Sequence, residues 1–103
     1  MITDKIQARA LKTWYPKGHE LHGDILPSLI GLVGESGELL NLYKKDRYKP
    51  GFWAAECDYV DELGDCLYYL AILAYQHDLT LEQLSVLNRD KLRDGKNGWA
   101  DAS

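Results

Sequence analysis

The chain has 103 residues, of which 46% are hydrophobic and 27% are charged, and this composition supports one folded domain spanning residues 1–103. Its formal net charge is −4, with 16 acidic residues against 12 basic residues. This balance disfavours nucleic acid as the main partner, because phosphate backbones bind basic surfaces.

Secretion and membrane insertion are also disfavoured. The N-terminus has Asp4 where a signal peptide would have a basic region, and no run of about 18 apolar residues occurs. Cys57 and Cys66 are nine residues apart in one predicted helix, so their side chains point to opposite sides and cannot pair within it. We therefore expect reduced thiols, no membrane partner and a cytoplasmic protein.

The first half of the chain predicts two helices. The first covers about residues 3–15, with Thr3 as the candidate N-terminal cap. The second starts near Asp24, another cap candidate, and runs to about residue 48. The sequence Lys49-Pro50-Gly51 then breaks the helix.

The second half predicts two more helices. The third covers about residues 53–77. Thr80 and Gln83 form a capping-box pattern, which places a fourth helix from there to about residue 93. No alternating strand pattern is present. We therefore predict an all-α, four-helix, bundle-like fold, since short connections favour packed neighbouring helices.

The second and third predicted helices each carry two acidic residues three positions apart. These are Glu35 and Glu38 on the second helix, and Glu62 and Asp65 on the third. Residues at this spacing share one helix face. Facing carboxylates repel one another unless they are protonated or bound to cations, and oxygen-only ligands suit a hard cation such as Mg²⁺. These acids are therefore the predicted metal ligands.

The charge pattern around these acids allows two interpretations. No Lys or Arg occurs between residues 56 and 78, whereas a solvated helix face normally mixes both signs. This favours a metal site over a solvated acidic face, although both remain open. Lys45, seven positions after Glu38, lies on the same stripe and is a candidate to bind a substrate anion.

Three glycines flank the first acidic pair, at Gly31, Gly34 and Gly37. Each costs about 0.5–1 kcal/mol relative to alanine inside a helix. Their presence indicates that something approaches the backbone closely. Helix packing and room for a metal and substrate are both open explanations.

Apolar residues fill one broad arc of each of these two helices. On the second helix they are Leu29, Leu32, Val33, Leu39, Leu40 and Tyr43, and on the third they are Tyr59, Leu63, Cys66, Leu67, Leu70, Leu73 and Ala74. A chain of this length cannot cover two such arcs alone, so we expect a homo-oligomer, a dimer or a tetramer.

Two motifs resemble those of the MazG-like, all-α nucleoside triphosphate pyrophosphohydrolases. The first is G-L-V-G-E-S-G-E-L at residues 31–39, and the second is D-E-L-G-D-C-L-Y-Y-L at residues 61–70. The resemblance covers about residues 14–92. It implies hydrolysis of a nucleoside triphosphate, usually a deoxynucleotide or a modified one, to the monophosphate and pyrophosphate, by attack of metal-activated water on the α-phosphate. The implied cofactor is Mg²⁺, with Mn²⁺ as a substitute.

The resemblance also implies roles for particular residues. Glu35, Glu38, Glu62 and Asp65 match the metal ligands, and either Glu35 or Glu38 is a candidate to orient the attacking water.

Further residues are candidates for contact with the substrate. Asn88 and Lys91 match an N-x-x-K-L motif near the phosphates, and Tyr69 matches a position near the nucleotide in some relatives. Trp14 is a candidate to stack on a base, with packing in the core as its alternative. Homo-oligomerisation, with a nucleotide pocket shared between subunits, is implied as well.

Two positions depart from the family pattern. Gly34 stands where many relatives have a second glutamate that is proposed to activate water, so the general base is open. Gly95 stands where many have an arginine.

Three alternatives have to be weighed. The fold could serve as a non-catalytic nucleotide- or metal-binding oligomeric module, or as an enzyme similar to phosphoribosyl-ATP pyrophosphohydrolase. A di-iron carboxylate bundle is disfavoured, because no histidine follows a motif acid at the third position.

Overall fold

The computed structural model describes residues 2–14 and 24–94. The described parts are all-α and contain no strand. The helices are α1 (Lys5–Trp14), α2 (Leu26–Tyr48), α3 (Glu56–Gln76) and α4 (Leu81–Arg93). The predicted end of the first helix at Tyr15, and the departure at Gly95, lie outside the described residues.

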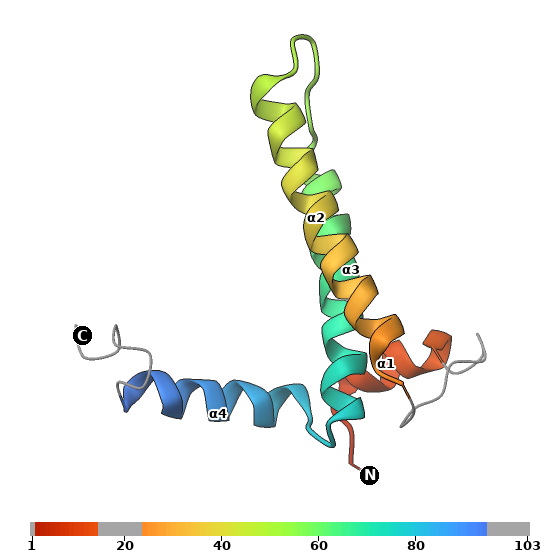
Figure 1. The fold of residues 1–103 in the computed structure, drawn as a ribbon, viewed down its shortest axis with the longest axis vertical. Coiled ribbons are helices and arrows are strands. Elements are labelled where there is room, and N and C mark those ends of the chain that lie inside the picture. Colours follow the sequence, from red (N-terminus) through yellow and green to blue (C-terminus); the bar gives the residue numbers. More distant parts are fainter. Residues whose placement is uncertain (1, 15–23, 95–103) are drawn as a thin grey trace.

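A long hairpin of α2 and α3 forms the body of the molecule (Figure 1). Helix α1 packs across the lower part of α3, and α4 leaves the base of α3 and runs away from the hairpin (Figure 1). The radius of gyration is 16.5 Å, against about 13 Å for a compact domain of this length. The predicted four helices are therefore confirmed, in an arrangement that is open within one chain.

The first helix is capped one residue later than the sequence predicted. Asp4, and not Thr3, supplies the cap: the Gln7 backbone N–H donates to Asp4 Oδ1 at 2.8 Å, and the Asp4 N–H donates to Gln7 Oε1 at 3.2 Å. This reciprocal pair satisfies two N–H groups that would otherwise lack partners at the helix start.

The predicted start of α2 is confirmed to within two residues. Asp24 Oδ1 accepts a hydrogen bond from the Leu26 N–H at 2.9 Å, and Pro27 occupies the first turn, where a missing N–H costs nothing. Ser28 is buried, and its hydroxyl contacts Gln76 Oε1 at 2.5 Å. This contact ties the start of α2 to the end of α3.

A carboxylate clamp holds the tip of the hairpin together. Asp46 accepts hydrogen bonds from the Ala54 N–H at 3.1 Å and from the Tyr59 hydroxyl at 2.8 Å. These two donors lower the pKa of Asp46, and the same contact raises the pKa of Tyr59 to about 12. In the connection between α2 and α3, Gly51 turns the chain with a φ of 78°, a left-handed conformation that favours glycine.

The third helix begins later than predicted, at Glu56, and Trp53 is exposed in the connection before it. The Asp58 carboxylate accepts the Ala55 N–H at 2.9 Å, so Asp58 caps the first turn of α3. The predicted box at the start of α4 is confirmed, with Thr80 and Gln83 bonded reciprocally at 2.9 and 3.0 Å.

The described core is small and lies where α1 crosses α3. Ala10, Trp14, Ala71 and Ile72 form it, with Tyr68 and Tyr69 packed against it. The apolar arcs predicted for α2 and α3 are only partly covered. Exposed members of the two arcs are Leu29, Val33, Leu40, Tyr43, Leu63, Leu67 and Leu70.

Gly31 is the glycine that helix packing explains. A Cβ at this position would collide with the Tyr69 ring, so its absence lets α3 place that ring against α2. A Cβ at Gly34, Gly37 or Gly64 would meet no atom within 4 Å. Packing is thus confirmed for Gly31 alone among these positions.

Both cysteines are free, as the sequence predicted, with Cys57 exposed and Cys66 half-buried. Within the described ranges, none of the helices combines the length and apolar character needed to cross a membrane.

Candidate metal centre

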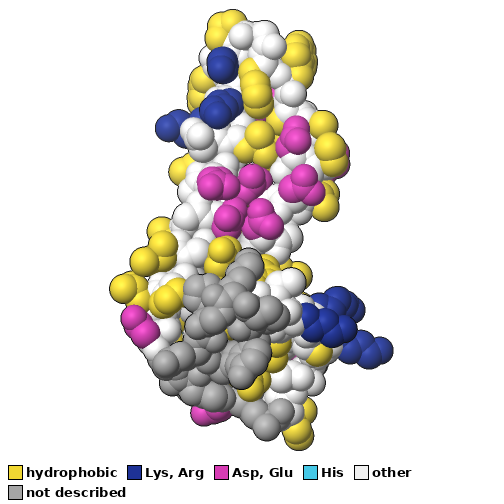
Figure 2. Space-filling model, turned by 90° about the vertical axis from the view of Figure 1, so that its right-hand side faces the viewer, with side chains coloured by type: hydrophobic (Ala, Val, Ile, Leu, Met, Phe, Trp, Pro, Cys, Tyr) yellow, Lys and Arg dark blue, Asp and Glu magenta, His cyan; other side chains and the backbone are white. Residues whose placement is uncertain are grey.

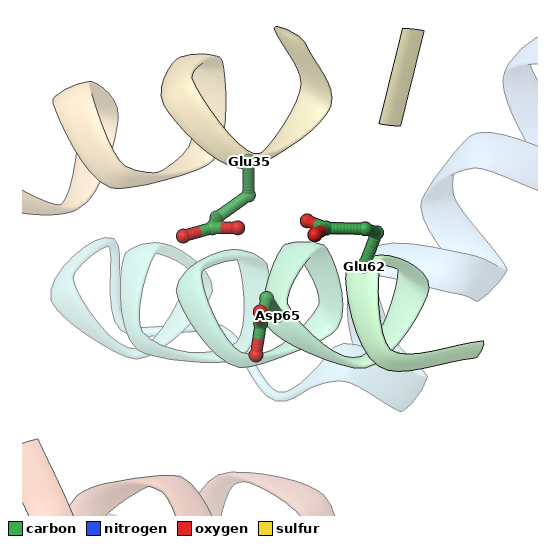
Figure 3. A group of neighbouring side chains, drawn as sticks. All are labelled: Glu35, Glu62 and Asp65. Carbon is green, nitrogen blue, oxygen red and sulfur yellow. The ribbon is translucent and has the colours of Figure 1, made fainter. Parts of the chain in front are cut away.

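Three carboxylates from the two long helices converge midway along the hairpin. Glu35 extends from α2 toward α3, where Glu62 and Asp65 lie one turn apart, and one oxygen of each lies within 4.8 Å of the others (Figure 3). Figure 2 shows acidic side chains gathered on this face, with Lys and Arg side chains nearer the hairpin tip. The two predicted acidic stripes therefore do face each other.

Local helix geometry explains this convergence. Glu62 and Asp65 are three residues apart on one helix, so both project from the same face of α3. The close approach of α2 and α3 at Gly31 and Tyr69, one turn from Glu35, brings the opposite acid into reach.

Two oxygen atoms of the cluster are buried without a hydrogen-bond partner in the described chain, Glu35 Oε2 and Glu62 Oε2. A buried polar atom without a partner is costly, and a carboxylate oxygen can bind either a proton or a cation. Both atoms belong to the convergent trio. Either a proton or a cation would satisfy these two oxygens.

The pKa values of the cluster also indicate that its carboxylates favour a bound proton or cation. Burial, together with the negative charges of Glu38 and Asp65, raises the pKa of Glu35 from 4.5 to about 7. Burial and the charge of Glu38 also raise the pKa of Glu62. Near neutral pH, Glu35 thus resists ionisation unless a positive charge lies close to it.

Glu38 lies at the edge of this site. It is exposed and is not part of the convergent trio, yet its charge acts on both Glu35 and Glu62. It lines a pocket of about 250 Å³ beside the cluster, together with Glu62 and Lys45. The predicted fourth ligand is thus adjacent to the cluster, and the predicted anion-binding lysine shares its pocket.

The same pocket is also lined by Asn41 and Phe52, two residues that the sequence pattern does not indicate as part of the site. Asn41 lies three positions after Glu38, so extending the acidic stripe by one turn would have found it. Phe52 follows the Pro-Gly turn and has no such periodic signal. Only the folded hairpin places it beside α2.

The aromatic candidates pack mainly against each other. Trp14 is 3% exposed, and its ring lies 6.2 Å from Tyr69 and 6.3 Å from Tyr68. The packing alternative for Trp14 is therefore confirmed, and the structure gives no support for stacking on a base. Tyr69 is half-buried one turn from Asp65, and burial together with Glu35 raises its pKa.

Asn88 and Lys91 are exposed on α4, which runs away from the hairpin (Figure 1). Asn88 lines a separate hollow with Leu70 and Leu81 at the junction of α3 and α4. Within a single chain, the fold therefore does not bring these two predicted phosphate contacts to the carboxylates.

One curated relative is similar in sequence, the "Gene 37 protein" of Mycobacterium phage L5. It is 42% identical over 71 residues, which cover 66% of this chain. The chain spans 62% of the length of that relative. No family model matches the sequence, and no solved structure matches it.

Proposed function

We propose that this protein is a Mg²⁺-dependent nucleoside triphosphate pyrophosphohydrolase, which converts a nucleoside triphosphate to its monophosphate and pyrophosphate. The convergence of Glu35, Glu62 and Asp65 between α2 and α3 carries the proposal. The resemblance of the two motifs to MazG-like enzymes supplies the reaction. We also propose that the fold is MazG-like and that oligomerisation completes it.

The residues present fit a divalent cation. The donors are all carboxylate oxygens, which hard cations such as Mg²⁺ or Mn²⁺ prefer. Two of these oxygens are buried and lack a partner, and repulsion disfavours full ionisation without added positive charge. Glu35, Glu62 and Asp65 would hold the ion, with Glu38 at the open side. When bound, Mg²⁺ would neutralise phosphate charge and lower the pKa of water.

The chain's own groups then have distinct tasks. Glu38 is exposed beside the cluster, where its carboxylate would orient a water molecule for attack. Lys45, on the wall of the neighbouring pocket, places a positive charge where a phosphate group of the substrate would enter. Asn41 in the same pocket offers an amide to the substrate.

A second copy of the chain would complete this site. Exposed apolar residues along both long helices, among them Leu29, Val33, Leu40 and Leu63, support an interface with such a copy.

The charges on α4 suggest how a second copy would contribute. Arg89, Lys91 and Arg93 lie on this helix together with Glu82 and Asp90, and Asp90 is paired with both arginines. In a homo-oligomer, this helix could bring Lys91 to the acidic face of the neighbouring subunit. Asn88 and Lys91 would then contact phosphates bound there.

A non-catalytic binding module keeps the same site without turnover, and phosphoribosyl-ATP is an alternative substrate. Both are separated from the proposal by a pyrophosphate-release assay with Mg²⁺ over canonical and modified nucleoside triphosphates and phosphoribosyl-ATP. We expect release from at least one nucleoside triphosphate. Metal-dependent nucleotide binding without release would establish the binding module, and release from phosphoribosyl-ATP alone would establish the second alternative.

A further inference from the structure

The direction of α4 is set at a short corner. Only two residues in the described chain have a left-handed backbone, Gly51 and Asp78, and Asp78 turns the chain between α3 and α4 with a φ of 59°. Beyond this corner α4 contacts α3 little (Figure 1). The position of α4 therefore depends on contacts at the corner, which include the packing of Leu81 against the core and the hydrogen bonds described next.

The side chain of Gln7, on α1, forms hydrogen bonds with the backbone of this corner. Its side chain is 0% exposed, although glutamine is seldom fully buried. Its Nε2 donates to the Leu79 carbonyl at 2.7 Å and lies 3.4 Å from the Ala71 carbonyl. One amide group thus joins α1, the last turns of α3 and the corner itself.

Asp4 adds a second connection. Its Oδ1 accepts the Gln7 N–H, which caps α1, while its Oδ2 accepts the N–H of Leu81 at 2.7 Å. Leu81 is the first residue of α4. One carboxylate therefore accepts hydrogen bonds from the first turns of both α1 and α4, and it fixes the starts of these two helices relative to each other. The cap of α1 alone would need only one of these two oxygens.

We propose that Asp4 and Gln7 are positioning residues, which lock the α3–α4 corner and thereby aim α4, with Asn88 and Lys91, at the site of a second copy. The aiming of the helix stands on the hydrogen bonds alone. Its consequence for substrate binding rests on the proposed function.

Two variants separate the lock from ordinary capping. Asp4→Ser keeps one oxygen to cap α1 but leaves the Leu81 N–H without its acceptor. Gln7→Glu keeps the acceptor for the Asp4 N–H, but when ionised it cannot donate to the Leu79 carbonyl. Asp24→Ala is the matched control, since it removes a capping contact at the start of α2 that has no link to α4 and lies far in sequence from both labels.

The measurement is an electron–electron distance between spin labels on Cys57 and on an Arg89→Cys variant, in a Cys66→Ser background. Labelled chains are diluted with unlabelled chains so that only distances within one chain count. We expect one narrow distribution for the parent and for Asp24→Ala, and broad distributions for Asp4→Ser and Gln7→Glu. Hydrogen exchange at the Leu81 amide should accelerate at least about tenfold in Asp4→Ser.

Unchanged distributions in both variants would refute the lock. For the active enzyme, we expect KM for the triphosphate to rise in Asp4→Ser while kcat and Mg²⁺ binding change little. A broadened distribution with unchanged KM would refute the role in positioning. If the parent chain releases no pyrophosphate, the proposed function fails, and the distance measurement still decides whether Asp4 and Gln7 aim the helix.

Discussion

At the scale of single residues, the fold holds the carboxylates of the acidic cluster close together, so their negative charges repel one another. Glu35 has its pKa raised to about 7 because it is partly desolvated and faces other acids. Such an arrangement opposes folding of the metal-free chain near neutral pH. Removing one negative charge should therefore affect stability and function in opposite directions.

We predict that Glu35→Gln abolishes pyrophosphate release while the melting temperature of the metal-free chain stays level or rises. The variant removes a ligand and also a repelling charge. Circular dichroism and the release assay measure the two effects. Asp61→Asn is the control, since Asp61 is exposed on α3, which carries Glu62 and Asp65, and lies outside the cluster. Normal activity in Glu35→Gln would show that the cluster is not the catalytic site.

The glycines of α2 allow a second prediction, which concerns packing. Gly31→Ala would place a methyl group into the Tyr69 ring, so we expect it to lower the free energy of unfolding, although alanine is intrinsically the better helix former. Gly37→Ala meets open space in the single chain and should raise stability by about 0.5–1 kcal/mol. Urea denaturation compares the two. Equal effects would mean that the approach of Tyr69 does not constrain Gly31.

At the scale of helices, the sequence predicted those features that depend on near neighbours. The box of Thr80 and Gln83 is complete within four residues, so it was found correctly. The sequence favours Thr3 as the cap of α1, since threonine is a good cap residue. Asp4 serves instead, since it also reaches Leu81, which is 77 residues away in sequence. Contacts of that kind leave no local signal.

The candidate site shows the same division. Helical periodicity alone brought the two acids of α3 together, and the opposition of Glu35 followed from antiparallel packing. The burial of Trp14 and the position of Phe52 depend on how whole helices lie against each other. The covering of Val33 and Leu40, which are 70% and 60% exposed, would depend on a second chain, which one sequence does not describe.

The clamp at the hairpin tip leads to a prediction at this scale. Tyr59→Phe removes the hydroxyl that donates to Asp46, so we expect a loss of about 1 kcal/mol in unfolding free energy. Tyr43→Phe serves as the control, because Tyr43 lies exposed on α2 and donates no hydrogen bond to this clamp. Equal stabilities of the two variants would mean that the tip does not depend on the hydroxyl.

At the scale of the whole molecule, one chain is an open structure with a small core. Its long helices leave apolar residues uncovered, and its fourth helix extends away from the body (Figure 1). These features have one common explanation in a symmetric assembly, in which each chain covers the exposed faces of another.

We predict that light scattering at micromolar concentration gives a mass of at least twice 11.7 kDa. Leu40→Glu should shift the mass toward the monomer, since it places a charge on an exposed apolar face. Lys44→Glu, on the polar part of the same helix, should leave the mass unchanged. A wild-type monomer that still releases pyrophosphate would contradict both the interface and the shared site.

Melting curves with and without Mg²⁺ at pH 5 and pH 8 test whether Glu35, Glu62 and Asp65 hold a divalent cation. Because the folded pKa of Glu35 lies above its unfolded value of 4.5, its contribution to apo stability is complete below pH 4.5 and disappears as the pH rises through about 7. Mg²⁺ binds the ionised acids, so its effect should be larger at pH 8. A Mg²⁺ concentration of about 100 times Kd adds about 2.7 kcal/mol, or about 12 °C for a domain of this size. We predict that shift for the wild type at pH 8, a smaller one at pH 5, and none for Asp65→Asn. If Mg²⁺ changes the melting temperature at neither pH value, the three carboxylates do not form a binding site for this ion.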